Sequence, residues 1–298
     1  LLCNEDNLSV SVDNEEIEMV VEQERLSSTV SRFAVHLSPA FLYQKLAARI
    51  PDVWPVLQLI AAAADEKGWA LYVVGGAVRD LLLSLLGEAS PTIDIDLVVE
   101  GAETGSGVVL AEAVQATYPR SSTLQQDLLR RDFTINAMAI RLNGKAPGQL
   151  LDTLGGIDDL QQRLVRVLHA DSFIDDPTRI FRAVRFATRL DFRLETRTER
   201  WITQATGSEL YAHLQADVQK GDRKVPALQG RLKAELQYLL SAAQWKRSLA
   251  EVDRLGALVC LHPELDISPE VWQQLSQMEQ WLNKFDVKSS KWLMRLEL

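Results

Sequence analysis

Cysteine, histidine and long apolar runs are scarce in this sequence of 298 residues. The two cysteines, Cys3 and Cys260, are too few for a disulfide framework or a zinc site. The longest apolar stretch, residues 53–64, is shorter than the ~20 residues that span a bilayer. Residues 1–7 are acidic, unlike the basic and then apolar start of a signal peptide. These absences predict a cytoplasmic protein that does not associate with a membrane.

Charge is distributed unevenly along the chain, whose formal net charge is −9. Residues 1–30 contain eight acidic residues and one arginine, which gives a local charge of −7. Residues 161–200 contain nine arginines and six acidic residues, which gives a local charge of +3. A ligand meets the local field, so the acidic total does not exclude a polyanionic partner.

The expected elements change along the chain from mixed to helical. Apolar runs bounded by turn signals predict strands at residues 70–74, 93–99 and 135–142. Helical periodicity predicts helices around these strands, at residues 41–50, 53–67, 77–86 and 108–116. From Asp171 onward strand signals disappear, and helices are expected at residues 177–190, 196–206, 226–243, 245–257 and 269–284. The pattern predicts an α/β head followed by an all-helical region.

The first candidate motif is a pair of glycines between a predicted strand and a predicted helix. A turn at Gly76 would leave backbone N–H groups free to cradle a phosphate. Arg79, one turn into the helix, could add its guanidinium to the same phosphate. A glycine turn followed by a surface pair of Arg79 and Asp80 is the simpler reading of these residues, because an isolated glycine motif is a weak signal for phosphate binding.

The second motif is an acidic pair in the next predicted strand. Asp94 and Asp96 are two residues apart, so their side chains are expected on the same side of the strand. Two neighbouring carboxylates repel each other unless a cation lies between them, and Mg²⁺ prefers such oxygen ligands. The alternative is an edge strand with a solvated acidic face.

Arginines dominate the other two motifs. Arg131 precedes a predicted strand and could reach a triphosphate, although a salt bridge in a surface turn is the simpler reading. The remaining motif places four residues at a spacing of three, which puts them along one helix face: Asp176, Arg179, Arg182 and Arg185. A solvated basic stripe would look the same, but arginine without lysine favours bidentate recognition of phosphates or bases.

In this order, the segments resemble the class II tRNA nucleotidyltransferase family, which comprises CCA-adding enzymes and the related bacterial poly(A) polymerases. The resemblance covers residues 70–245 and is carried by GGAVRD, DIDLVVEG, RRDFTINAMAI, LLDTLGGIDDLQQRLVRVLH, DDPTRIFRAVRFATRLDF and RLKAEL. It implies an α+β fold, with a polymerase-β-like nucleotidyltransferase head followed by an all-helical neck and a partial body. It also implies Mg²⁺-dependent addition of C, A or both from CTP and ATP to the 3′ end of tRNA, without a nucleic-acid template and with release of pyrophosphate.

The resemblance also implies roles for individual residues. Asp94 and Asp96 match the catalytic, metal-binding pair of the family. Nucleotide-binding roles are implied for seven further residues: Gly76, Arg79, Arg131, Asp176, Arg179, Arg182 and Arg185. The family usually has several tens of residues between the acidic strand and the RRDF segment, including a third active-site carboxylate. Here only residues 100–130 intervene, so no third carboxylate is assigned.

Element order and resemblance together predict four parts of the chain. These are an acidic mobile extension at 1–38, the head domain at 39–168, a helical neck for base recognition and RNA binding at 169–240, and a helical body at 241–298. Two alternatives to full CCA addition remain open. One is a poly(A) polymerase, or an enzyme that adds only CC or only A; the other is a non-catalytic module that binds nucleotides or RNA.

Overall fold

The computed structural model describes residues 37–88, 94–101, 120–121, 123–208, 224–262 and 264–284. The helix expected at 108–116 and almost all of the acidic extension lie outside these residues. No helix in the described part of the chain has both the length and the apolar character needed to cross a membrane. The cellular compartment therefore stays a prediction.

A mixed five-stranded sheet with the strand order β3-β2-β1-β4-β5 forms the first lobe. Its strands are β1 (Ala70–Val74), β2 (Asp96–Glu100), β3 (Arg120–Ser121), β4 (Ala139–Arg141) and β5 (Leu150–Leu151). Strand β1 pairs antiparallel with β2 and β4, and β4 pairs antiparallel with β5. Strand β2 pairs parallel with β3. Because β1 is central, the turn that follows it lies between its two neighbouring strands.

Helices cover both faces of this sheet. They are α2 (Pro39–Arg49), α3 (Trp54–Glu66), α4 (Gly76–Leu85) and α6 (Leu124–Leu129). The alternation of side chains along β1 places Leu71 and Val73 in the hydrophobic cluster that contains α2, α3 and α4. Tyr72 and Val74 instead belong to the cluster that contains α6. The end of β1 and the end of α6 are thereby fixed relative to each other.

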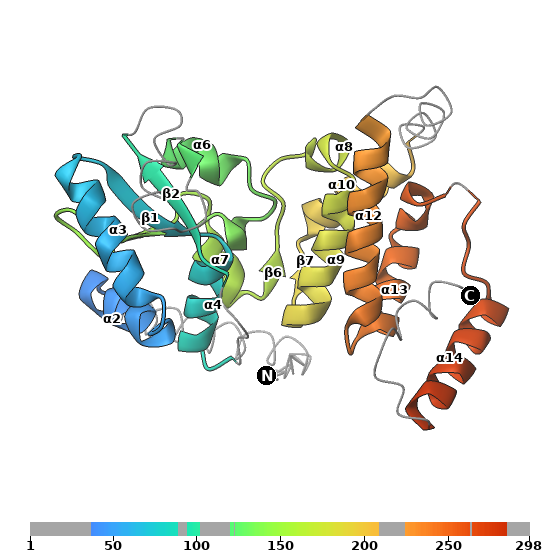
Figure 1. Cartoon of the computed structure of the whole chain (residues 1–298). Coiled ribbons are helices and arrows are strands. Elements are labelled where there is room, and N and C mark those ends of the chain that lie inside the picture. Colours follow the sequence, from blue (N-terminus) through green and yellow to red (C-terminus); the bar gives the residue numbers. More distant parts are fainter. Residues whose placement is uncertain are drawn as a thin grey trace, which may run out of the picture.

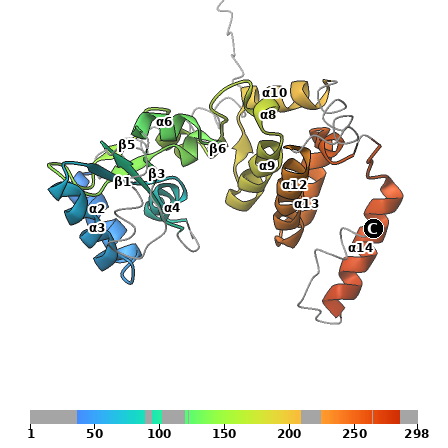
Figure 2. The same cartoon turned by 45° about the horizontal axis from the view of Figure 1, so that its top comes forward.

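Most of the remaining elements are helices. They are α7 (Gly156–Gln161), α8 (Ser172–Asp175), α9 (Thr178–Leu190), α10 (Thr196–Thr206), α12 (Lys224–Ser241), α13 (Trp245–Arg254) and α14 (Pro269–Lys284), with 3₁₀ helices η1 (Thr134–Asn136) and η2 (Ala257–Cys260). Figures 1 and 2 place α8 to α13 together as a second lobe, with α14 farthest from the sheet. One hydrophobic cluster continues from the sheet into α9, α10 and α12. The α+β class, with a head followed by helices, is confirmed.

Several bounds differ from the sequence-based expectation, and the two clearest differences concern strands. The strand expected at 135–142 is confined to β4, because the residues before it form η1. The side chain of Asn136 in η1 donates a hydrogen bond to Asp132 at 2.9 Å. The expectation that strands end before Asp171 is wrong, because β7 (Arg193–Leu194) pairs parallel with β6 (Leu164–Val165). Strands of two residues carry no periodic signal, so a partner distant in the sequence decides them.

Candidate functional site

The turn between β1 and α4 brings the backbone close to an arginine. Gly75 has φ +75° and ψ −132°, a conformation that is open to glycine and strained for other residues. A Cβ atom on Gly75 would lie 2.1 Å from Nη1 of Arg131, whereas a Cβ on Gly76 would meet Arg79 Nη2 at 3.5 Å. The glycine that this close approach requires is therefore Gly75, the neighbour of the predicted Gly76.

We expect Gly75→Ala to lower the free energy of unfolding by about 1–3 kcal/mol, the usual cost of a strained backbone conformation. The new Cβ would also push Arg131 off the turn. Gly76→Ala is the matched control, and at the first position of α4 it should be neutral or slightly stabilising. Urea unfolding of both variants measures the difference. Equal losses in the two variants would contradict a special requirement at Gly75.

Arg131 connects this turn to the acidic pair. Its Nη1 lies 3.6 Å from Oδ2 of Asp96, while its Nε and Nη2 each lie 3.0 Å from Oδ2 of Asp127. Asp127 is buried, and its Oδ1 accepts hydrogen bonds from Nε of Arg130 at 3.0 Å and from Nη2 of the same residue. Two arginines therefore share one buried carboxylate, and one of them extends toward Asp96.

The acidic pair lies at the start of β2. Asp96 is the first residue of the strand and is paired with Val74, so it lies beside the glycine turn. Asp94 precedes the strand by two residues, so the prediction that one strand carries both aspartates is wrong; both are exposed. The part of the chain that the structure describes contains no group of three or more potential metal ligands among its His, Cys, Asp and Glu residues. Two exposed carboxylates nevertheless fit Mg²⁺, which commonly takes one or two carboxylates together with substrate phosphates.

Arg79 is enclosed where α4 meets α9. It is only 4% exposed, and its Nε donates to Oδ1 of Asp80 at 2.8 Å while Nη1 donates to Oδ1 of Asn136 at 2.5 Å. Its guanidinium also lies 5.0 Å from the ring centroid of Phe186 on α9. Burial lowers the pKa of Arg79, but arginine keeps its charge at any ordinary pH. The structure thus places Arg79 inside the contact between the two lobes.

The predicted base-reading residues lie at the start of α9, and each bonds other partners. Oδ1 of Asp176 accepts from the backbone N–H and the hydroxyl of Thr178, and Oδ2 accepts from Nη1 of Arg231 at 2.6 Å. Arg179 donates from Nη1 to Oγ of Ser172 at 3.0 Å and from Nη2 to the carbonyl of Arg130 at 3.3 Å. Arg179 is thereby linked to the segment that carries Arg131.

The other two predicted arginines of α9 bind carboxylates, and one of them, Arg182, connects the lobes. Arg182 donates from Nε to Asp132 at 2.8 Å and from Nη1 to Glu235 of α12 at 3.1 Å. Arg185 donates to the other oxygen of Glu235 at 2.9 Å. Burial by itself would raise the pKa of Asp132, but Arg182 and hydrogen bonds from Asn136 and the Phe133 backbone outweigh it, so this pKa is below its ordinary value. These ion pairs anchor α9 between the head and α12.

The predicted set lacks several residues that carry these contacts, among them Gly75, Asp127, Asp132, Arg231 and Glu235. Sequence signals exist for these five. Gly75 belongs to the glycine pair, Asp132 to RRDF, and Arg231 and Glu235 to RLKAEL. Asp127 precedes two arginines by three and four residues, the spacings at which side chains meet on a helix.

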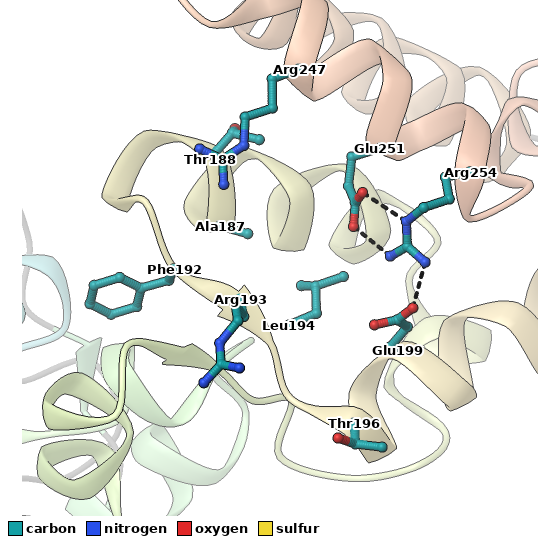
Figure 3. Close-up of a pocket in the computed structure, with 10 residues that line it drawn as sticks. All are labelled: Ala187, Thr188, Phe192, Arg193, Leu194, Thr196, Glu199, Arg247, Glu251 and Arg254. Carbon is teal, nitrogen blue, oxygen red and sulfur yellow. Dashed lines mark hydrogen bonds and ion pairs between the residues drawn. The ribbon is translucent and has the colours of Figure 1, made fainter. Parts of the chain in front are cut away.

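A pocket of about 370 Å³ lies away from these residues, at the C-terminal end of α9. Thr188, Arg193 and Glu199 are among the residues that line it (Figure 3). Arg254 in its wall is bound by Glu251 at 2.6 Å and by Glu199 at 2.5 Å (Figure 3). None of the predicted site residues lines this pocket.

Comparison with known proteins gives matches to RNA-processing enzymes. Residues 108–166 match the family model of the poly A polymerase head domain. The A-adding tRNA nucleotidyltransferase of Geobacter sulfurreducens is 33% identical over 294 residues, with 86% of this chain and 30% of that protein covered. The structure of the Thermotoga maritima CCA-adding enzyme complexed with tRNA has a TM-score of 0.69 and 31% identity, covering 85% of this chain and 64% of that chain.

A solved structure of a tRNA-processing enzyme, in an apo form, is similar over a larger share of its own length. Its TM-score is 0.63 and its sequence is 30% identical, with 80% of this chain and 71% of that chain covered. By contrast, the chain spans only 30% of the length of the Geobacter sulfurreducens relative. Because these matches cover 80% or more of this chain, the similarity includes the head and helices that follow it.

Proposed function

The chain belongs to the class II tRNA nucleotidyltransferase family, and we propose that it adds C, A or both to the 3′ end of tRNA from CTP and ATP. The supporting observation is the position of Arg131, which lies against Gly75 and 3.6 Å from Asp96. These three residues come from three separate motifs. Arg179, from a fourth motif, bonds the carbonyl of the residue before Arg131. The arginine proposed for phosphate binding thus contacts Asp96 of the acidic pair, and the arginine proposed for base reading contacts the residue beside it.

In the proposed reaction, the 3′-oxygen of the RNA forms a bond to the α-phosphorus of the nucleotide, and pyrophosphate leaves. Asp94 and Asp96 would hold Mg²⁺, which lowers the pKa of the 3′-hydroxyl and neutralises charge on the α-phosphate. Arg131 would bind the triphosphate through its guanidinium, which suits phosphate oxygens. No nucleic-acid template is needed, because protein side chains read the base.

Base choice follows from hydrogen-bond complementarity at Asp176 and Arg179. Cytosine and adenine each carry an amino donor beside a ring-nitrogen acceptor. Asp176 would accept from the amino group in place of its present partner Arg231, and Arg179 would donate to the ring nitrogen. Uracil and guanine present an oxygen at that position, which would face a carboxylate and leave both acceptors unsatisfied.

We expect Arg179→Ala to reduce discrimination as well as rate. Without the Arg179 guanidinium, the incoming base is oriented only by Asp176 and by base stacking. The free-energy penalty that kcat/KM shows against UTP and GTP should therefore shrink by about 1–3 kcal/mol. The measurement is kcat/KM for the four nucleotides on one truncated tRNA. Arg200→Ala, which removes an exposed arginine of α10, serves as the control and should leave selectivity unchanged. A uniform loss for all four nucleotides with Arg179→Ala would contradict the base-reading role.

The proposed function is tested with tRNAs that end before CCA, after C and after CC, each incubated with CTP or ATP alone. Addition limited to C and A, and stopping at CCA, supports a full CCA-adding enzyme. Addition of only CC or only A identifies a partial activity, and long A tails identify a poly(A) polymerase. A folded protein that binds nucleotides but extends none of these tRNAs would contradict the catalytic proposal.

A further inference from the structure

We propose that Asp127 is a positioning residue of the nucleotide site, which holds Arg131 against the glycine turn and at a distance from Asp96. This inference rests on the proposed function. Asp127 is 3% exposed, and both of its carboxylate oxygens accept hydrogen bonds from arginine. Burial without such partners would be costly for a carboxylate, so the two guanidinium groups offset the cost of burying this one.

The position of Asp127 is set by the sheet. It lies on α6, which is capped at its start by Thr123, whose Oγ1 accepts from the N–H of Gln126 at 3.2 Å. Leu124 and Leu128 of the same helix are buried against the face of the sheet that carries Val74. Since Gly75 follows Val74 directly, the carboxylate and the turn are parts of one packed unit. Asp127 therefore fixes the guanidinium relative to the place where we expect phosphates.

The balance of charge around Asp127 explains why Arg131 has to be held in place. Two guanidinium groups share one carboxylate, so one positive charge remains uncompensated by Asp127. Nη1 of Arg131 lies 3.6 Å from Asp96, too far for a hydrogen bond. Without Asp127, Arg131 would be free to move closer to Asp96 and form a hydrogen-bonded ion pair with it. It would then compete with a cation for that carboxylate and with the nucleotide for its own guanidinium.

A second set of hydrogen bonds links Asp127 to the residue proposed to read the base. Asp127 holds the side chain of Arg130, and the carbonyl of Arg130 accepts from Nη2 of Arg179 at 3.3 Å. Arg130 itself is exposed, so its ion pair with Asp127 does little for packing. One buried carboxylate thus orients the residue proposed for the triphosphate and is linked to the residue proposed for the base.

A double-mutant cycle on nucleotide binding tests this role. The dissociation constants of ATP and CTP are measured by calorimetry in EDTA, for wild type, Asp127→Asn, Arg131→Met and the double variant. Asp127→Asn should weaken both nucleotides by about 10-fold, the size of one lost charge-assisted hydrogen bond. The double variant should bind within about twofold of Arg131→Met alone, because Asp127 acts through Arg131. Multiplicative losses would overturn the proposal.

Asp159→Asn is the matched control. Asp159 is a buried carboxylate of the same lobe, is paired with Arg166 at 2.8 Å, and receives a hydrogen bond from Thr134. It touches none of the predicted site residues in the described part of the chain. Its replacement should lower stability but leave both dissociation constants unchanged. An equal loss of binding in the control would show that Asp127 acts only through general stability, and would overturn the proposal.

Two further outcomes separate the inference from the proposed function. Wild-type protein that binds neither nucleotide would overturn the function and the inference together. Wild-type binding that Asp127→Asn leaves intact would overturn the inference alone. Asp127→Glu keeps the negative charge and should bind ATP more tightly than Asp127→Asn. Weaker ATP binding by Asp127→Glu would contradict the role of the Asp127 charge in holding Arg131. If Asp127→Asn does not fold, the same cycle is run with Asp127→Glu.

Discussion

Asp96→Asn should reduce nucleotide addition to tRNA by about 100- to 1,000-fold, the size expected when one electrostatic group is removed from a phosphoryl-transfer site. The substitution keeps the shape of the side chain but removes the charge that would hold Mg²⁺. Asp94→Asn should have an effect of similar size. Single-turnover incorporation of CTP or ATP in the presence of Mg²⁺ measures both.

The fold should survive these substitutions, because both carboxylates are exposed. The ion pair between Asp96 and Arg131 spans 3.6 Å with Asp96 64% exposed, so we expect its loss to change stability by no more than about 0.5 kcal/mol. Asp52→Asn replaces another exposed aspartate of the same lobe and should leave both activity and stability unchanged. A folded Asp96→Asn protein with nearly wild-type incorporation would remove the basis for the metal site.

Elements with strong local signals were predictable from the sequence. Strand β1, helix α10 and helix α14 have the expected bounds, and α9 begins one residue after the expected start at Pro177. Their apolar spacing, their proline and their glycine turns act within a few residues, so the pattern alone determines them. Strands β6 and β7 have two residues each and pair with each other although helices α8 and α9 lie between them in the sequence, so no local pattern determines them.

For the site, too, the sequence indicated features that depend on nearby residues better than features that depend on residues far away in the chain. Residue type and spacing identified Asp96, Arg131 and Arg179 as candidates, and the structure links all three through direct contacts or one intervening residue. Short spacing in the sequence indicates the pairs of Asp80 with Arg79 and of Asp127 with Arg131, but it does not indicate the pair of Asp132 with Arg182, which is 50 residues away. Arg79 and Arg182 were expected to face a nucleotide, yet Asp80 and Asp132 bind them in the structure. Tertiary packing decides the ion pairs between residues far apart in the sequence, so sequence spacing does not predict them.

The largest effect on stability is expected from Arg182→Met. This change removes the cation between Asp132 of the head and Glu235 of α12, while the methionine keeps most of the side-chain volume. Glu235 retains Arg185, but Oδ2 of Asp132 loses its charged partner in a buried position. Breaking a buried ion pair costs about 3–5 kcal/mol, and we expect the lower end because Oδ1 keeps its hydrogen bonds from Asn136 and a backbone N–H. Urea unfolding measures the loss.

Arg254→Met is the control for this change. Arg254 also binds two carboxylates, Glu251 and Glu199, but its side chain is 50% exposed. Exposed ion pairs contribute little, so the control should lose no more than about 1 kcal/mol. Similar losses in the two variants would contradict a special role for the pair at the contact between the lobes.

The pH dependence gives this prediction an independent check. The pKa of Asp132 is lowered in the folded protein, so its stabilising contribution is fully present above the ordinary aspartate pKa of about 3.9 and is lost as the pH falls through the folded value. In Arg182→Met, burial without the cation should instead raise that pKa, and proton uptake would relieve the unpaired charge. The stability gap between wild type and variant should therefore be largest near neutral pH and narrow as the pH falls toward 3. A gap that stays constant over this range would mean that Arg182 stabilises the lobes through packing, with no dependence on the charge of Asp132.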